Sequence, residues 1–122
     1  MVTVRRIVAD IGVENPAEVA GFYRRLFDLD VLMDQGWIVT LGTAEKARVQ
    51  VAFLSEGGAG APVPDLSIEV DDPDEVYQRA QTSGCEIVYP LTDEPWQVRR
   101  FFLRDPAGRV INVLAHLQDQ DR

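Results

Sequence analysis

The feature that most constrains the fold of this chain is a helix-start signature that occurs twice. Asn15 precedes Pro16, and Asp72 precedes Pro73 at a spacing of 57 residues. Asn and Asp are favoured N-cap residues, and proline suits the first helical position because the N–H that it lacks would be unpaired there anyway. The recurrence predicts two similar modules in tandem, each with one helix.

Apolar and β-branched runs around each signature predict the order strand, helix, strand, strand, strand in both modules. Module 1 covers about residues 1–54 and module 2 about residues 65–117, within a single domain of 122 residues. Residues 55–64 are rich in glycine and proline and form a linker, and residues 90–95 are expected to be a loop. The expected strands are 3–13, 29–33, 37–41, 48–54, 65–70, 85–89, 100–103 and 110–114.

Each expected helix has apolar residues at helical spacing that predict a buried side. The first helix should end near Phe27, and Gly84 should terminate the second. The residues expected on the buried sides are Val19, Phe22, Tyr23 and Leu26 in the first helix and Val76, Tyr77 and Ala80 in the second.

The last two strands flank a tight turn at Asp105-Pro106-Ala107-Gly108. An aspartate that can cap its own backbone, a proline with a preset φ and a glycine free to adopt positive φ are typical turn residues. The flanking segments are aromatic or β-branched, as strands prefer. The sequence therefore predicts a closing β-hairpin.

Three stretches resemble the vicinal oxygen chelate superfamily, which includes glyoxalase I, extradiol dioxygenases, fosfomycin-modifying enzymes and bleomycin resistance proteins. They are the closing hairpin from Phe101 to Val113, the segment from Val13 to Phe27, and the entry to module 2 from Ile68 to Asp72, followed by Gly84 to Ile87. The resemblance covers nearly the whole chain. It implies an α+β fold in which two tandem βαβββ modules (the glyoxalase/bleomycin resistance fold) form a curled mixed sheet containing a cleft, often in a homodimer.

The resemblance also implies where a metal would be bound in the metal-dependent members. Their ligands are usually a histidine on the first strand of each module and a glutamate on the last strand. Here the corresponding positions hold Val8, Asp65 and Asn112, with Gln50 on the last strand of module 1. Valine has no lone pair to donate, and amides are weak neutral ligands. We therefore expect no metal ligands and no cofactor, while an altered divalent-metal site stays an alternative.

Acidic residues near these positions are candidates for ligand binding. Because side chains alternate along a strand, Asp10 should face the cleft with Val8, and Glu69 with Asp65. Carboxylates in such a site bind an amine or guanidinium or act as a general base, for which Asp65 and Asp10 are the candidates. The alternative is structural: Asp65 ends the linker in water, Asp10 pairs with an arginine, and Glu69 lies at the rim.

Aromatic side chains provide a second set of candidates, since planar ligands stack on them. Trp37, Trp96 and Phe102 are expected at the cleft wall, although Trp37 suits a structural role equally well. One of Arg99 and Arg100 should face the cleft, to bind an anionic group or to pair with an acidic residue. The predicted ligand-binding residues are Asp10, Trp37, Asp65, Glu69, Trp96, Arg100, Phe102 and Asn112.

Composition narrows the range of partners. The formal net charge of −8 argues against nucleic acid and is compatible with a cationic small molecule. No apolar run is long enough for a membrane span. The single cysteine, Cys85, is expected to be packed in the fold and agrees with a cytoplasmic location, while His116, the only histidine, is expected at the surface.

We therefore predict a non-catalytic binder, similar to antibiotic-resistance proteins of the bleomycin type, that sequesters an organic, cationic and aromatic compound in a cleft completed in a homodimer. The competing class is an enzyme of the same superfamily. It would be a lyase, isomerase or dioxygenase with an altered metal site, or a metal-free enzyme with Asp65 or Asp10 as base. A third alternative is a small interaction domain with an inert cleft.

Overall fold

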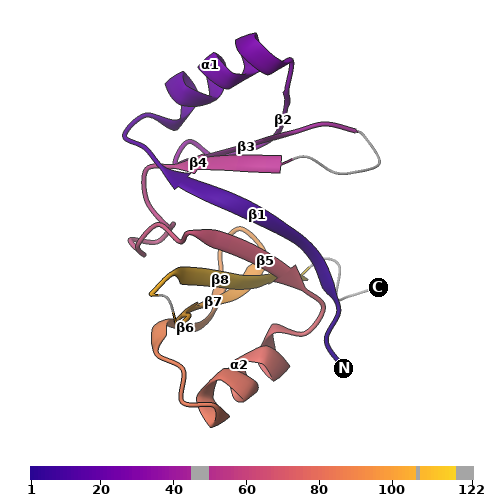
Figure 1. Ribbon diagram of the computed structural model, residues 1–122, viewed down its shortest axis with the longest axis vertical. Helices are drawn as coiled ribbons and strands as arrows, with labels where there is room; N and C mark the ends of the chain where they lie inside the picture. The colour runs from indigo at the N-terminus through magenta and orange to yellow at the C-terminus, as the bar shows by residue number, and fades with distance from the viewer. Residues whose placement is uncertain (45–49, 107, 118–122) are drawn as a thin grey trace. The chain divides into compact units, whose positions relative to one another are not determined.

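The computed structural model describes residues 1–44, 50–106 and 108–117. Their elements follow the order strand, helix, strand, strand, strand twice, which confirms the predicted α+β class and the repeat (Figure 1). The elements are β1 (Val4–Gly12), α1 (Pro16–Phe27), β2 (Asp30–Asp34), β3 (Ile38–Gly42), β4 (Gln50–Leu54), β5 (Leu66–Val70), α2 (Pro73–Thr82), β6 (Ile87–Glu94), β7 (Val98–Arg104) and β8 (Val110–His116).

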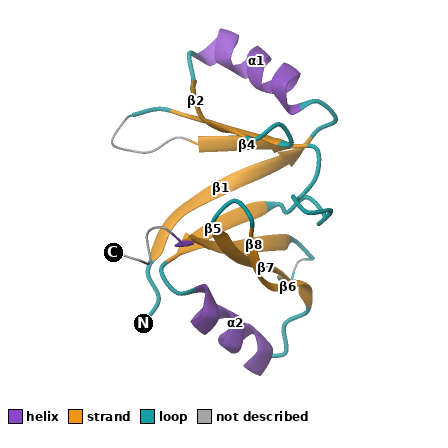
Figure 2. Ribbon diagram, turned by 180° about the vertical axis from the view of Figure 1, so that it is seen from behind, coloured by secondary structure: helices purple, strands orange, loops and turns teal. Residues whose placement is uncertain are grey.

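The chain forms two compact units. The N-terminal unit is Val8–Val63, and the C-terminal unit is Met1–Ile7 together with Pro64–Arg122. Each unit has one helix on one face of its own strands (Figure 2). The first seven residues of the chain thus belong to the same unit as β5 to β8.

In the N-terminal unit the strand order is β2-β3-β4-β1, with β1 parallel to β4 and the other pairs antiparallel. α1 covers one face through a cluster built on Ala20, Val39, Leu41 and Phe53. The opposite face has its own cluster of Val8, Ile38, Ala52 and Leu54, against which Trp37 packs. Both faces of these strands are therefore apolar, and burial of such surface is the main stabilising term in folding.

The C-terminal unit repeats this arrangement with the order β5-β8-β7-β6, in which β5 is parallel to β8. α2 packs on one face, where Val70, Ala80, Phe101, Ile111 and Val113 form a buried cluster. Val76 and Tyr77 of α2 contact this cluster, as the helical spacing predicts. The rings of Tyr77 and Phe101 lie edge to face, with centroids 4.9 Å apart.

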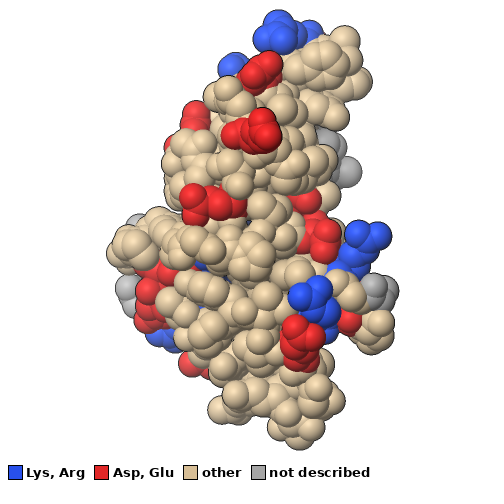
Figure 3. All heavy atoms as spheres, turned by 90° about the vertical axis from the view of Figure 1, so that its left-hand side faces the viewer, with Lys and Arg blue, Asp and Glu red and all other residues tan. Residues whose placement is uncertain are grey.

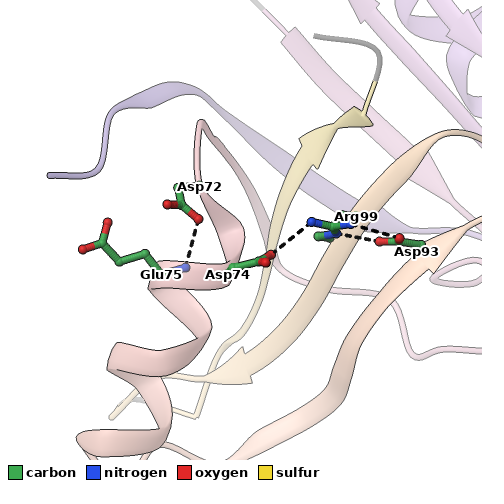
Figure 4. Close-up of polar contacts among 5 residues, drawn as sticks. All are labelled: Asp72, Asp74, Glu75, Asp93 and Arg99. Atoms are coloured by element: carbon green, nitrogen blue, oxygen red, sulfur yellow. Dashed lines mark hydrogen bonds and ion pairs between the residues drawn. The ribbon is translucent and has the colours of Figure 1, made fainter. Parts of the chain in front are cut away.

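Both helices begin at the predicted caps. The Asn15 side-chain oxygen accepts the Glu18 N–H at 3.3 Å, and the Asp72 carboxylate accepts the Glu75 N–H at 3.1 Å. Figure 4 shows the second of these bonds. Each bond satisfies one of the N–H groups that lack a partner in the first turn of a helix.

The closing hairpin also forms as predicted. The Asp105 carboxylate accepts the Arg109 N–H at 2.9 Å, and the Asp105 carbonyl accepts the Gly108 N–H at 2.9 Å. Gly108 has φ +87°, a conformation that L side chains rarely adopt. The Asp-Pro-x-Gly sequence therefore sets this turn locally.

Two sequence-based expectations about the strands and the helix packing are wrong. β6 continues through Glu94 and replaces the loop expected at 90–95. Pro90 is tolerated because β6 is the edge strand, where a missing N–H breaks no ladder, and the register shifts between Tyr89 and Thr92.

The second correction concerns the buried side of α1. Phe22 and Leu26 are exposed, and only Val19 and Tyr23 of the predicted set contact the core. The helical period identifies an apolar side but does not specify how wide a stripe the strands beneath it cover.

None of the helices in the described part of the chain combines the length and apolar character that a membrane crossing requires.

Candidate functional site

One face of the C-terminal unit is not covered by its helix, and polar side chains gather there. α2 packs on Val70, Phe101, Ile111 and Val113, so the residues that alternate with these point to the other side. The strand register joins them in rows across the sheet: Ser67 pairs with Asn112, and Asn112 with Phe102. We call this the helix-free face, made up of Ser67, Glu69, Arg100, Phe102, Asn112, Leu114 and His116.

Arg100 forms a buried ion pair beside this face. Its Nε lies 2.6 Å from the Glu94 Oε2, and the two side chains are only 4% and 3% exposed. The Tyr89 hydroxyl donates a hydrogen bond to the same Glu94 oxygen at 3.0 Å. The Arg100 guanidinium also lies about 5 Å from the ring centroids of Tyr89, Trp96 and Phe102. Cation–π contacts in a desolvated setting help to offset the cost of burying the charge.

Arg99 points to the opposite side of the sheet. It pairs with Asp93 at 2.6 Å and with Asp74 of α2 at 3.4 Å (Figure 4). The hydrogen bond from Arg99 lowers the pKa of the Asp93 carboxyl. Arg99 thus ties the first turn of α2 to β6 and β7. Of the two arginines, Arg100 is therefore the one that belongs to the helix-free face.

Glu69, on β5, contacts one residue of β1 and one residue of β8. Its Oε1 accepts a hydrogen bond from the Arg6 Nε at 2.6 Å, and its Oε2 lies 3.1 Å from the His116 Nδ1. The hydrogen bond with His116 and the charge of Arg6 lower the pKa of the Glu69 carboxyl, against the opposing effect of burial. Glu69 is accordingly an ionised carboxylate at neutral pH.

His116 is half-buried in this network rather than a free surface group, contrary to the expectation from the sequence. The signal that identifies it is the period of two along the last strand. Asn112, Leu114 and His116 alternate with Val113 and Ala115. A histidine in phase with a predicted site residue shares its face.

Asp65 lies where β5 and β8 begin to pair. Its carboxylate accepts the Val110 N–H at 2.8 Å, its own N–H donates to the Val110 carbonyl at 2.8 Å, and the Arg109 guanidinium is 3.7 Å away. These contacts give Asp65 a structural role in joining the two strands. Its part in ligand binding or in catalysis stays a prediction.

Asn112 combines burial with an incomplete set of hydrogen bonds. The residue is only 8% exposed, and its Nδ2 donates to the Ser67 hydroxyl at 3.0 Å. Its Oδ1 is buried and has no hydrogen-bond partner among the described residues. A buried acceptor without a partner costs about 1–3 kcal/mol. Asn112 therefore offers an acceptor that a bound molecule can satisfy.

The other predicted residues lie in the N-terminal unit. Asp10 pairs in register with Ala52 on β4, and Trp37 packs, partly buried, on the cluster that contains Val8. The structure thus brings Glu69, Trp96, Arg100, Phe102 and Asn112 together in the C-terminal unit. Asp10 and Trp37 stay predicted ligand contacts.

The residues at the family's metal positions do not fit a resident divalent metal. Val8 lies in an apolar cluster, and Asn112 presents one neutral amide oxygen. Within residues 1–44, 50–106 and 108–117, no group of three or more His, Cys, Asp or Glu side chains is arranged to hold a metal ion.

The surplus of acidic residues does not mark one binding patch. Figure 3 shows Asp and Glu side chains spread over the visible face, some of them beside Lys or Arg. On the helix-free face the carboxylate of Glu69 is paired with arginine, as is the neighbouring Glu94. On the face that Figure 3 shows, the acidic residues are thus spread over the surface and are not gathered into one patch.

Comparison with known proteins gives one family match. Residues 4–113 match the model of the Glyoxalase/Bleomycin resistance protein/Dioxygenase superfamily. No curated protein matches the sequence.

Several solved structures are similar in fold. One is described as an NAD-dependent benzaldehyde dehydrogenase from Legionella pneumophila, with TM-score 0.74 and 18% identity over 91% of this chain and 99% of that one. A glyoxalase/bleomycin resistance protein/dioxygenase superfamily member from Vibrio splendidus 12B01 has TM-score 0.62 and 17% identity over 93% and 99%. Methylmalonyl-CoA epimerase from Mycobacterium tuberculosis has TM-score 0.59 and 15% identity over 92% and 86%. At these identities the similarity establishes the fold alone.

Proposed function

Because the chain belongs to the Glyoxalase/Bleomycin resistance protein/Dioxygenase superfamily, we propose that it binds a small organic molecule on the helix-free face of its C-terminal unit. The observation that carries this proposal is the buried Asn112 Oδ1, which has no hydrogen-bond partner among the described residues. A ligand N–H or O–H group would supply the missing donor and relieve the cost of the buried acceptor.

The surroundings of Asn112 favour an aromatic ligand. Phe102 lies directly across from Asn112 in the β7–β8 register, and Arg100 connects the rings of Phe102, Tyr89 and Trp96. Tyr89 and Trp96 keep part of their surface exposed. A planar ligand would stack on such rings in offset or edge-on geometry.

The charges on this face bear on the charge of the ligand. Glu69 is paired with Arg6, and Glu94 with Arg100, so neither carboxylate is left to attract a cation. This balance favours an uncharged aromatic donor, such as an amide, aniline or phenol, over the cationic compound expected from the sequence. The proposed role is sequestration of that compound, because binding through Asn112 requires no reaction.

The test is a thermal-shift screen with aromatic amides, anilines and phenols, followed by titration calorimetry on the compounds that bind. Asn112→Leu removes the acceptor at similar volume, so we expect at least a tenfold loss of affinity, which is about 1.4 kcal/mol. Gln78→Leu, the same kind of change on the exposed side of α2, is the matched control and should bind normally. Unchanged affinity in Asn112→Leu would refute the proposed site.

We also propose that the protein acts as a homodimer. Phe22, Leu26 and Phe27 near the end of α1 are each more than half exposed. A cluster of exposed large apolar residues commonly marks an association surface. Light scattering coupled to size-exclusion chromatography should give a dimer mass for the native chain and a monomer mass for Leu26→Lys. A monomeric native chain would exclude this part of the proposal.

A further inference from the structure

The pairing of His116 with Glu69 suggests an activity in addition to binding. The Glu69 carboxylate is held on one oxygen by Arg6 from β1 and faces the His116 Nδ1 with the other. An ionised carboxylate can only accept, so the Nδ1 of the neutral imidazole carries the proton. The lone pair then lies on Nε2, the ring nitrogen that does not face Glu69.

A histidine oriented in this way by a carboxylate is the usual form of a general base. We propose that His116 accepts a proton at Nε2 from an O–H acid, a phenol or an enol, bound at this end of the helix-free face. Glu69 is the positioning residue, and Arg6 holds Glu69 in place. His116 is one-third exposed, so a ligand can reach the imidazole from solvent.

The proposed step is a single proton transfer. The O–H bond of the ligand breaks and leaves its electron pair on oxygen, and an N–H bond forms at Nε2. The products are a ligand oxyanion and an imidazolium that donates to Glu69 through Nδ1. No oxidant, metal or co-reactant is needed. Protonation of the imidazole gives the hydrogen bond to the Glu69 carboxylate a cationic donor as well as an anionic acceptor, which strengthens it.

Among the described residues, the strands next to His116 contribute the following charged groups. β5 contributes Glu69 and β1 contributes Arg6, while β7 places the apolar Val98 directly across from His116. Beyond Val98, the charges of Glu94 and Arg100 are paired with each other. Glu69 is therefore the carboxylate that is hydrogen-bonded to the imidazole.

This inference does not depend on the proposed contact with Asn112. Asn112 lies four residues before His116 on β8, and the usual rise of a strand separates them by about 13 Å. The two sites are therefore tested by different variants.

The probe is 4-nitrophenol, whose phenolate absorbs visible light and whose neutral form does not. It is added to the native protein at a pH below the pKa of the free phenol, so that any additional phenolate reports proton transfer to the protein. We expect the phenolate signal to rise with protein concentration until it saturates. His116→Asn keeps a donor toward Glu69 but has no Nε2, and should lower the signal at least about tenfold.

Glu69→Gln should lower the signal by a smaller factor, since the base remains but loses its orienting anion. Equal phenolate signals in the native protein and in His116→Asn would overturn the proposal. Gln78→Leu, on the exposed side of α2, serves as the control and should leave the signal unchanged.

A second measurement needs no variant. Nitrogen NMR of the only histidine in the chain reports which ring nitrogen carries the proton. We expect the Nδ1–H form of the neutral ring. A predominant Nε2–H form would also overturn the proposal.

Discussion

The Nε of Arg100 lies 2.6 Å from the Oε2 of Glu94, and both side chains are almost completely buried. The two residues come from neighbouring antiparallel strands, β7 and β6. The Tyr89 hydroxyl donates a further hydrogen bond to the Glu94 carboxylate. Removal of one partner would leave the other as an unpaired buried charge.

Arg100→Met and Glu94→Gln should each therefore lower the free energy of unfolding by about 3–5 kcal/mol. Tyr89→Phe should cost only about 1 kcal/mol, because it removes one neutral donor. Urea denaturation of the three variants measures these values. A loss below 1 kcal/mol for both charge variants would show that the pair is solvated in solution.

Glu69 should make the stability of the protein pH-dependent on the acid side. Its folded-state pKa is lowered, first by the hydrogen bond with His116, below the ordinary value of 4.5. A lowered carboxyl pKa contributes stability that is fully present above the ordinary value and is lost as the pH falls through the folded-state value. Glu69→Gln should therefore flatten the decline of the unfolding free energy below pH 4.5.

The matched control for this measurement is Glu86→Gln, since Glu86 is an exposed glutamate near Arg104 and its exposed ion pair contributes little. Its pH profile should follow that of the native protein. If the Glu69→Gln profile also runs parallel to the native one, the hydrogen bond with His116 does not stabilise the folded state.

Asp65 provides a test of the acidic site expected from the sequence. Asp65→Asn keeps an oxygen for the Val110 N–H but removes the charge. We expect stability within about 1 kcal/mol of the native value and unchanged affinity for any compound that binds through Asn112. Calorimetric titration measures the affinity. A tenfold or larger loss would make the Asp65 carboxylate part of the ligand site.

Gly57 should be intolerant of any side chain. A Cβ built at this position would lie 2.0 Å from the Pro62 carbonyl oxygen and 2.8 Å from the Ala61 carbonyl oxygen. Gly57→Ala must therefore displace the backbone of the loop, at a cost of about 1–3 kcal/mol or more. Gly12→Ala, whose Cβ would meet Val63 at an ordinary 3.7 Å, is the control and should change stability far less. Thermal unfolding of both variants measures this difference in stability.

Much of the fold was predictable from the sequence because its determinants are local. The cap side chains of Asn15 and Asp72 accept N–H groups three residues further along the chain. In the turn, the Asp105 carboxylate accepts the N–H of Arg109, four residues further along. The aromatic and β-branched composition of the hairpin flanks placed Asn112 and Phe102 on strands. The repeated helix-start signature predicted the two modules. The motifs of the closing hairpin, of the first helix and of the entry to module 2 indicated the superfamily.

The sequence by itself thus determined the element order, the caps, the closing turn and the family. Only the tertiary structure decided which polar groups meet, because contacts such as Glu69–Arg6 and Glu69–His116 join residues 63 and 47 positions apart. Strand register fixes such pairs, and no local preference encodes it. The same reason explains the buried Glu94, which the sequence placed in a loop, and the exposed Phe22: burial depends on what packs against a residue, which is a property of the folded chain.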